Sequence, residues 1–151
     1  MKELDIGSEK IEDEGSYLAI DGKIAARYKL RDAIRDDAKD AIETIKKAGF
    51  EVVMVTGDSK VEAERVAKET GIDSYYARLN PIDKSKKVEE YQKRGAVVMV
   101  GDGIHDTVAL GLSDVSIAMG GGTDVAMGVS DTVLLRDSLE SLKDALLISK
   151  T

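Results

Sequence analysis

Hydrophobic residues from position 50 onward form short continuous runs, separated by stretches in which apolar residues have helical spacing. Most of these runs stop at a turn that contains glycine or aspartate, as strands buried on both faces of a parallel sheet do. These runs predict strands at 50–55, 74–77, 97–100, 115–119 and 132–135. Their alternation with helices predicts an α/β fold: a parallel sheet with right-handed crossovers and helices on both faces.

Start and stop signals delimit several of the predicted helices. A helical pattern begins after residue 32 and ends at Gly49, where a glycine commonly terminates a helix. Ser59 and Glu62 have the spacing of a capping box at the start of the next helix. Asp137 and Glu140 are predicted to cap the final helix.

The N-terminal part has a different pattern. Residues 1–15 are polar and acidic and are interpreted as a lead-in, and residues 16–151 as a single domain. Two strand-like runs, 17–20 and 23–28, are separated only by Asp21 and Gly22. An Asp-Gly pair between two such runs is a strong signal for a type I′ turn, so the sequence predicts an N-terminal β-hairpin.

Composition narrows the classes of function. The chain has 151 residues and a net charge of −7, which argues against nucleic acid as a partner bound by general electrostatics. Cysteine is absent and there is one histidine, so thiolate and multi-histidine metal sites are excluded. No apolar run approaches the roughly 18 residues of a membrane span, and the sequence predicts a cytoplasmic protein.

Polar residues follow the ends of the predicted strands. Thr56 and Gly57 end the first strand, and the hydroxyl and amides there could hold a phosphoryl oxygen. Lys84 opens a later helix and could neutralise phosphate charge. Asp102 and Asp106 follow the strand at 97–100, and hard carboxylate oxygens suit Mg²⁺. Together these groups are what positioning of a phosphoryl group requires.

Each of these residues also has a plain structural interpretation. Thr56 taken alone is a hydroxyl at a strand end, Lys84 a surface lysine, and a single aspartate after a strand a helix cap. Their occurrence in order, each at a suitable turn, favours the phosphoryl site. The run from Gly120 to Gly122 lacks the Gly-Lys-Ser/Thr ending of a phosphate loop, so a tight turn between strand and helix is the better interpretation.

Four motifs together closely resemble the phosphorylation domain of P-type ATPases, in particular the heavy-metal-transporting branch. They are Thr56-Gly57-Asp58, Asn80-Pro81-Ile82-Asp83-Lys84, Gly101-Asp102-Gly103-Ile104-His105-Asp106 and Met119-Gly120-Gly121-Gly122-Thr123-Asp124-Val125-Ala126. The resemblance runs from about residue 16 to residue 148 and places the chain in the haloacid-dehalogenase-like superfamily, which has a Rossmann-like sheet. It implies that Thr56 and Lys84 contact the phosphoryl group and that Asp102, supported by Asp106, binds Mg²⁺.

The sequence also departs from the pattern of this family. The family's phosphate-accepting Asp lies in an Asp-Lys-Thr-Gly-Thr segment, which does not occur here. His105 stands where the family usually has Asn, and Thr107-Val108 stand where it usually has Ala-Pro. In the family the missing segment also forms a central strand of the sheet, and 17–20 is the best apolar candidate for that place.

Three functions remain open at this point. The first is a stand-alone or truncated relative that keeps the Mg²⁺ and phosphate cradle, lacks the usual phosphate acceptor and transports no ion by itself. The second is a small Mg²⁺-dependent phosphohydrolase with Asp21 as nucleophile and a phosphorylated small molecule as substrate, although a hairpin turn is the favoured interpretation of Asp21. The third is a non-catalytic regulatory or interaction module. Self-association that completes the sheet is a further prediction.

Overall fold

The computed structural model describes residues 16–20, 23–28 and 33–149. The chain divides into two compact units, residues 1–33 and 34–151, and each is described here by itself. In the first unit, β1 (Ser16–Ile20) pairs antiparallel with β2 (Lys23–Tyr28), and Ile20 lies opposite Lys23. The predicted hairpin is therefore confirmed. The prediction of a single domain over 16–151 stays a prediction.

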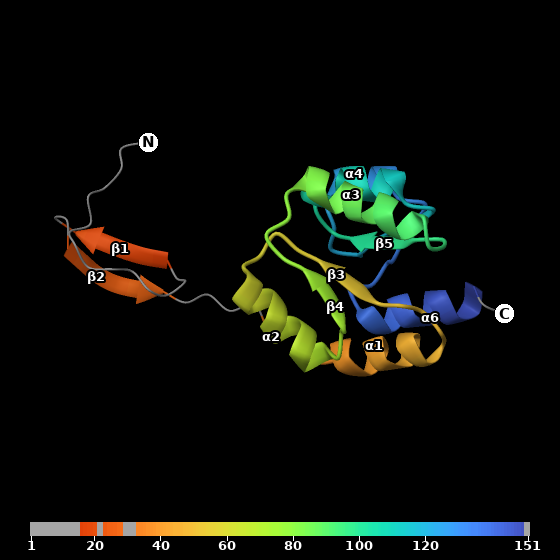
Figure 1. Ribbon diagram of the computed structural model, residues 1–151, viewed down its shortest axis with the longest axis horizontal. Coiled ribbons are helices and arrows are strands. Elements are labelled where there is room, and N and C mark those ends of the chain that lie inside the picture. The colour runs from red at the N-terminus through yellow and green to blue at the C-terminus, as the bar shows by residue number, and fades with distance from the viewer. Residues whose placement is uncertain (1–15, 21–22, 29–32, 150–151) are drawn as a thin grey trace. The chain divides into compact units, whose positions relative to one another are not determined.

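The second unit contains two separate groups of parallel strands (Figure 1). In the first group β3 (Val53–Val55) pairs with β4 (Ser74–Tyr76). In the second, β5 (Val98–Gly101), β6 (Val115–Ala118) and β7 (Thr132–Val133) follow one another in that order across the sheet. Among the strands of the described residues, β3 pairs only with β4, and β5 pairs only with β6.

Helices connect the strands and cover them in two groups. The helices are α1 (Ala38–Lys47), α2 (Lys60–Thr70), α3 (Pro81–Gln92), α4 (Thr107–Leu112), α5 (Asp124–Val129) and α6 (Leu139–Ser149), with a 3-10 turn η1 (Ile104–Asp106) before α4. Helices α3 and α4 lie together on one side of the strands, and α1 and α6 lie together on the other (Figure 1). The predicted α/β fold with parallel pairing is confirmed.

Strand β5 forms the boundary between two hydrophobic clusters. Val97 and Met99 pack with Val88 and Leu110 in one cluster. Val98 and Val100 pack in the other, whose buried members are Ile117, Met119, Leu134 and Leu142. Because successive side chains of a strand point to opposite faces, a continuous apolar run is needed to serve both clusters. This explains why the run before Gly101 contains no polar residue.

The helix caps agree with the sequence at most positions. Asn80 and Asp83 form a reciprocal capping box at the start of α3, with Asn80 Oδ1 accepting from Asp83 N at 2.8 Å. Ser59 caps α2 by accepting from the Glu62 amide at 3.2 Å. Gly71 ends α2 in the left-handed region, at φ 78°, where glycine carries no steric penalty.

The prediction for the cap of the final helix was wrong. The Asp137 side chain accepts from Arg35 instead, at 2.8 Å. The amide of Glu140 donates to the carboxylate of Asp37 at 3.1 Å, and Ser138 Oγ accepts from Ser141 N at 3.1 Å. A partner 103 residues away in the chain supplies one acceptor, and local spacing alone does not indicate it.

Candidate functional site

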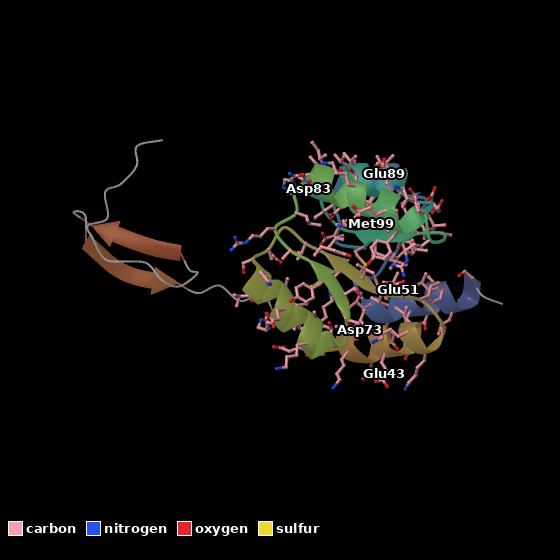
Figure 2. The ribbon with its side chains drawn as sticks, in the orientation of Figure 1. Glu43, Glu51, Asp73, Asp83, Glu89 and Met99 are labelled. Carbon is pink, nitrogen blue, oxygen red and sulfur yellow. The ribbon has the colours of Figure 1, made fainter. Side chains whose placement is uncertain are left out.

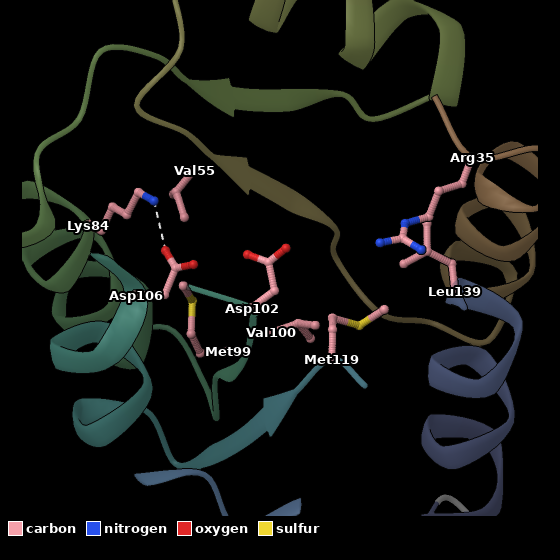
Figure 3. Close-up of a pocket in the computed structure, with 10 residues that line it drawn as sticks. Arg35, Val55, Lys84, Met99, Val100, Asp102, Asp106, Met119 and Leu139 are labelled. Atoms are coloured by element: carbon pink, nitrogen blue, oxygen red, sulfur yellow. Dashed lines mark hydrogen bonds and ion pairs between the residues drawn. The ribbon is translucent and has the colours of Figure 1, made fainter. Parts of the chain in front are cut away.

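A cavity of about 340 Å³ lies between β3 and β5, at the ends of these strands that lead into Thr56 and Asp102 (Figure 3). Its apolar lining comes from Val55, Met99, Val100, Met119 and Leu139. Its charged lining comes from Arg35, Lys84, Asp102 and Asp106. The turns that follow the strands of a parallel sheet lie at the same edge of the sheet, and such folds bind ligands at that edge.

An ion pair between Lys84 and Asp106 is enclosed at one side of this cavity (Figure 3). Lys84 Nζ donates to Asp106 Oδ1 at 2.7 Å, and the two side chains are 12% and 14% exposed. Lys84 comes from the first turn of α3, which the Asn80 cap fixes, and Asp106 comes from η1. The pair therefore places one ammonium group at the cavity without leaving it as a bare charge.

Asp102 is exposed at the end of β5, and its side chain points into the space between β5 and β3 (Figure 3). Within the described part of the chain, its carboxylate forms no hydrogen bond or ion pair, and it is therefore available to a ligand. The main-chain carbonyl of Asp102 accepts from the Thr123 amide at 2.8 Å, so the turn after β6 holds the turn after β5.

Two glycines allow close contacts here, Gly101 within the turn after β5 and Gly122 between that turn and the turn after β6. A Cβ atom on Gly101 would lie 2.8 Å from the Asp106 Cβ, and one on Gly122 would lie 3.0 Å from the Asp102 carbonyl oxygen. Real Cβ atoms essentially never show contacts under 3.0 Å, so Gly101 is required wherever Asp106 keeps its place. The run from Gly120 to Gly122 leads from β6 towards α5, which agrees with its interpretation as a tight turn.

Thr56 and Gly57 follow β3 but do not line the cavity, which Val55 does. The Thr56 hydroxyl donates to Asp58 Oδ2 at 2.9 Å and accepts from the Asp58 amide at 3.1 Å. A threonine hydroxyl that is bonded in this way stabilises the turn in which the threonine lies. The structure thus brings Lys84, Asp102 and Asp106 together, and the phosphoryl-binding role of Thr56 and Gly57 stays a proposal.

Arg35 is a lining residue that was not predicted from the sequence. It lies across the cavity from Lys84 (Figure 3), and its guanidinium donates to the Asp137 carbonyl at 2.7 Å and to the Asp137 carboxylate at 2.8 Å. Its place depends on a residue 102 positions later in the chain. A lone arginine before a helix carries no local signal for such a role.

The donor set at the cavity fits a magnesium ion that keeps part of its water shell. Among the described residues, no group of three or more His, Cys, Asp and Glu side chains is placed to hold a metal. Asp102 supplies one free carboxylate, and Asp106 adds a second that is shared with Lys84. Magnesium commonly binds through one or two carboxylates and completes its octahedron with water and phosphate oxygens, so the donor chemistry of Asp102 and Asp106 is of the kind that this ion takes.

The alternative nucleophile is Asp21. Asp21 and Gly22 lie outside the described residues, between two strands that pair with each other. The strand at 17–20, which the family resemblance suggested for the central place in the sheet, pairs with β2.

Comparison with known proteins assigns the family. Residues 1–113 match the family model of haloacid dehalogenase-like hydrolases. The chain belongs to this family. It is 39% identical over 146 residues to a copper-exporting P-type ATPase of Bacillus subtilis, and the aligned region covers 94% of this chain and 18% of the relative. It is 43% identical over 136 residues to a probable copper-importing P-type ATPase A of Enterococcus hirae, covering 88% and 19%.

Solved structures give the same result. The catalytic domain of the CPx-ATPase CopB-B matches with a TM-score of 0.79 and 34% identity, over 85% of this chain and 52% of that one. A zinc-transporting PIB-type ATPase in the E2.Pi state matches with a TM-score of 0.78 and 33% identity, over 89% and 22%. The resemblance to the phosphorylation domain of heavy-metal P-type ATPases is confirmed.

The chain corresponds to a small part of its relatives. It spans less than a fifth of the two curated ATPases named above, at 18% and 19% of their lengths. No helix within the described residues is long and apolar enough to cross a lipid bilayer.

Proposed function

We propose that residues 34–149 form the Mg²⁺- and phosphoryl-binding part of an aspartyl-phosphate site, without the usual phosphate-accepting segment. The observation that carries this proposal is the cavity in which a free Asp102 carboxylate lies with the enclosed pair of Lys84 and Asp106. A cation and two carboxylates at the end of a parallel strand are the parts needed to hold a phosphoryl group with its metal.

Each residue has a distinct part in this proposal. Asp102 holds the magnesium ion, and Asp106 both adds negative charge and fixes the ammonium of Lys84. Lys84 binds a phosphoryl oxygen as a point charge. Thr56 and Gly57 bind the phosphoryl group through a hydroxyl and an amide once the Thr56 hydroxyl leaves Asp58. A bound magnesium ion would neutralise phosphate charge.

The activity of the larger relatives is a separate proposal. Their names describe copper export and probable copper import, and this chain matches less than a fifth of each. We propose that the described fold transports no ion by itself, and that its contribution is restricted to phosphoryl and magnesium binding.

Magnesium titration of the whole chain tests the site. Amide NMR spectra recorded with increasing MgCl₂ are expected to show saturable shifts at Gly101, Asp102 and Gly103, and Asp102→Asn should abolish them. Asp124→Asn is the matched control, because Asp124 is also an exposed aspartate that follows a glycine turn but does not line the cavity. Shifts that survive Asp102→Asn would contradict the proposal.

Hydrolysis of a generic aryl phosphate in the presence of Mg²⁺ tests the alternative functions. No activity is expected, because the described residues place no free carboxylate other than Asp102 at the cavity. Activity that is lost in both Asp21→Asn and Asp102→Asn would establish the phosphohydrolase with Asp21 as nucleophile. Absence of activity together with a silent magnesium titration would favour the non-catalytic interaction module.

A further inference from the structure

A second cavity, of about 400 Å³, lies between α1 and the C-terminal end of α2. It shares no lining residue with the cavity at Asp102. Its lining residues are Lys39, Glu43, Lys46 and Lys47 of α1, together with Thr70 and Gly71 at the end of α2. Three of these six residues are lysines, in a chain whose net charge is −7. This lysine cavity is therefore a local concentration of positive charge on an acidic chain.

The spacing of the lysines sets the size of a ligand that could contact all of them. Lys46 and Lys47 follow Lys39 by seven and eight residues, which is two helical turns, or about 10–12 Å along the axis of α1. Glu43 lies between them, on the side of α1 that faces away from the strands (Figure 2). A single small anion reaches one end of this row, whereas a ligand with several linked anionic groups reaches both ends.

Lys46 is fixed in place across the cavity. Its Nζ donates to the Gly71 carbonyl at 2.9 Å and also pairs with Asp73. Carbonyl groups at the C-terminal end of a helix carry partial negative charge, so Lys46 neutralises a helix end that would otherwise repel an anion. The Thr70 hydroxyl donates to the Val66 carbonyl at 2.7 Å. The cavity thus offers a ligand positive charge rather than hydroxyl donors.

The Glu43 carboxylate lies where the charges of the three lysines act together. It accepts from Lys47 Nζ at 2.6 Å. The hydrogen bond and charge of Lys47, followed by the charges of Lys39 and Lys46, hold the pKa of Glu43 below its usual value. The Glu43 side chain is 55% exposed, and ion pairs as exposed as this one contribute little stability. A more highly charged anion can therefore replace this carboxylate, and Lys39 has no other partner within the described residues.

We propose that the lysine cavity binds a phosphate-rich polyanion through Lys39, Lys46 and Lys47, and that the Glu43 carboxylate competes with this ligand. Ammonium groups bind phosphate oxygens as point charges, and linked phosphate groups reach both ends of the lysine row. Soluble polyphosphates and the phosphate headgroups of a membrane surface share this chemistry. The site is separate from Asp102 and does not depend on the proposed function.

Amide NMR with sodium tripolyphosphate tests this inference on the whole chain. A chelator is present throughout, so failure of magnesium binding at Asp102 leaves the result unaffected. Saturable shifts are expected at Lys39, Glu43, Lys47 and Gly71, with an affinity at least about tenfold higher than that for orthophosphate. The affinity should fall as salt is added, because exposed charges are screened.

Three variants separate a charge effect from a change in the fold. Lys39→Gln and Lys47→Gln should each weaken tripolyphosphate binding by about two- to fivefold, as the loss of one exposed charge contact predicts. Glu43→Gln should strengthen binding by a similar factor, because it removes the competing carboxylate. Lys60→Gln is the matched control, since Lys60 is an exposed lysine that does not line the cavity, and its affinity should stay unchanged.

Cosedimentation with vesicles identifies the source of the phosphate groups. Phosphatidylserine vesicles that bind the chain, with loss of binding in a Lys39→Gln/Lys47→Gln double variant, would identify a membrane surface, and phosphatidylcholine vesicles are the control. Tripolyphosphate binding without vesicle binding would identify a soluble ligand. Binding of neither probe, an equal effect of Lys60→Gln, or unchanged affinity in Glu43→Gln would overturn the inference.

Discussion

At the scale of single residues, the ion pair of Lys84 and Asp106 gives the clearest energetic prediction. Lys84→Ala leaves the 14%-exposed Asp106 carboxylate without its partner, and we expect the free energy of unfolding to fall by about 3 kcal/mol. Urea denaturation measures this loss. Lys47→Ala is the control: its ion pair with Glu43 is exposed and should contribute about 0–1 kcal/mol. Equal losses in both variants would contradict the enclosed position of Lys84.

Gly101 gives a second prediction at this scale. A methyl group at this position meets the Asp106 Cβ at 2.8 Å, so Gly101→Ala should destabilise the chain by about 1–3 kcal/mol. Gly111 lies inside α4 with nothing within 4 Å of an added Cβ. Gly111→Ala should therefore stabilise by up to about 1 kcal/mol through helix propensity. Thermal unfolding of the two variants should thus shift in opposite directions, and shifts in the same direction would contradict this contact.

Part of the candidate site could be predicted from single residues. Asp102, Asp106 and Lys84 were identified because each follows a recognisable turn, and parallel strands bring such turns to one edge. Arg35 was missed, because its position depends on Asp137, far away in the sequence. The engagement of the Thr56 hydroxyl with Asp58 was also missed, since the residue pattern does not decide between two partners for a hydroxyl.

At the scale of elements, Asp131 links the segment after α5 to β6. Its carboxylate accepts from the amide and the hydroxyl of Ser116, both at 2.8 Å. These bonds lower the pKa of Asp131 below its usual value. A folded pKa below the unfolded one contributes stability at higher pH, and this contribution is lost as the pH falls through the folded pKa.

Asp131→Asn should therefore lose less stability than the parent chain on acidification. Urea midpoints measured between about pH 2 and pH 5 would show a shallower pH dependence in this variant. Asp36→Asn is the control for the removal of an aspartate, because Asp36 forms no side-chain hydrogen bond or ion pair within the described segments. A variant at Asp131 with an unchanged acid slope would contradict the linkage.

The elements themselves could be predicted better than their ends. The run at 50–55 gave a strand in the right place, but only Val53–Val55 pair, and the Phe50 amide donates to the Ile45 carbonyl at the end of α1. The run at 132–135 shortens to Thr132–Val133, and Leu135 is 96% exposed. A run of apolar residues indicates where a strand lies, whereas the length of the strand depends on how far its neighbour extends.

At the scale of the whole chain, the separation of β3 from β5 bears on association. Free strand edges are sites of self-pairing, and among the described strands β3 and β5 each pair with only one neighbour. Self-association that completes the sheet should therefore appear in sedimentation velocity as a concentration-dependent dimer. A single chain over a wide concentration range would contradict it.

The alternation of strands and helices was sufficient to predict the α/β architecture, since each run requires cover on both faces. It was not sufficient to predict that the parallel strands fall into two groups. Whether β3 and β5 pair depends on which strands are neighbours in space. The run before Thr56 and the run before Gly101 have similar patterns, so the sequence does not indicate the neighbours of either strand.

The turn after β6 contacts the turn after β5, so a substitution in one turn can change the orientation of Asp102 in the other. Gly122 lies 20 residues after Asp102, yet an added methyl group there would press on the carbonyl of Asp102, 3.0 Å away. The same methyl group would meet the Met119 carbonyl oxygen at 2.9 Å, so one of the two peptides would have to shift. A shift of the Asp102 peptide would redirect its carboxylate while both acidic groups stayed intact. Substitution of Gly122 therefore offers a way to change the proposed magnesium binding without removing a carboxylate.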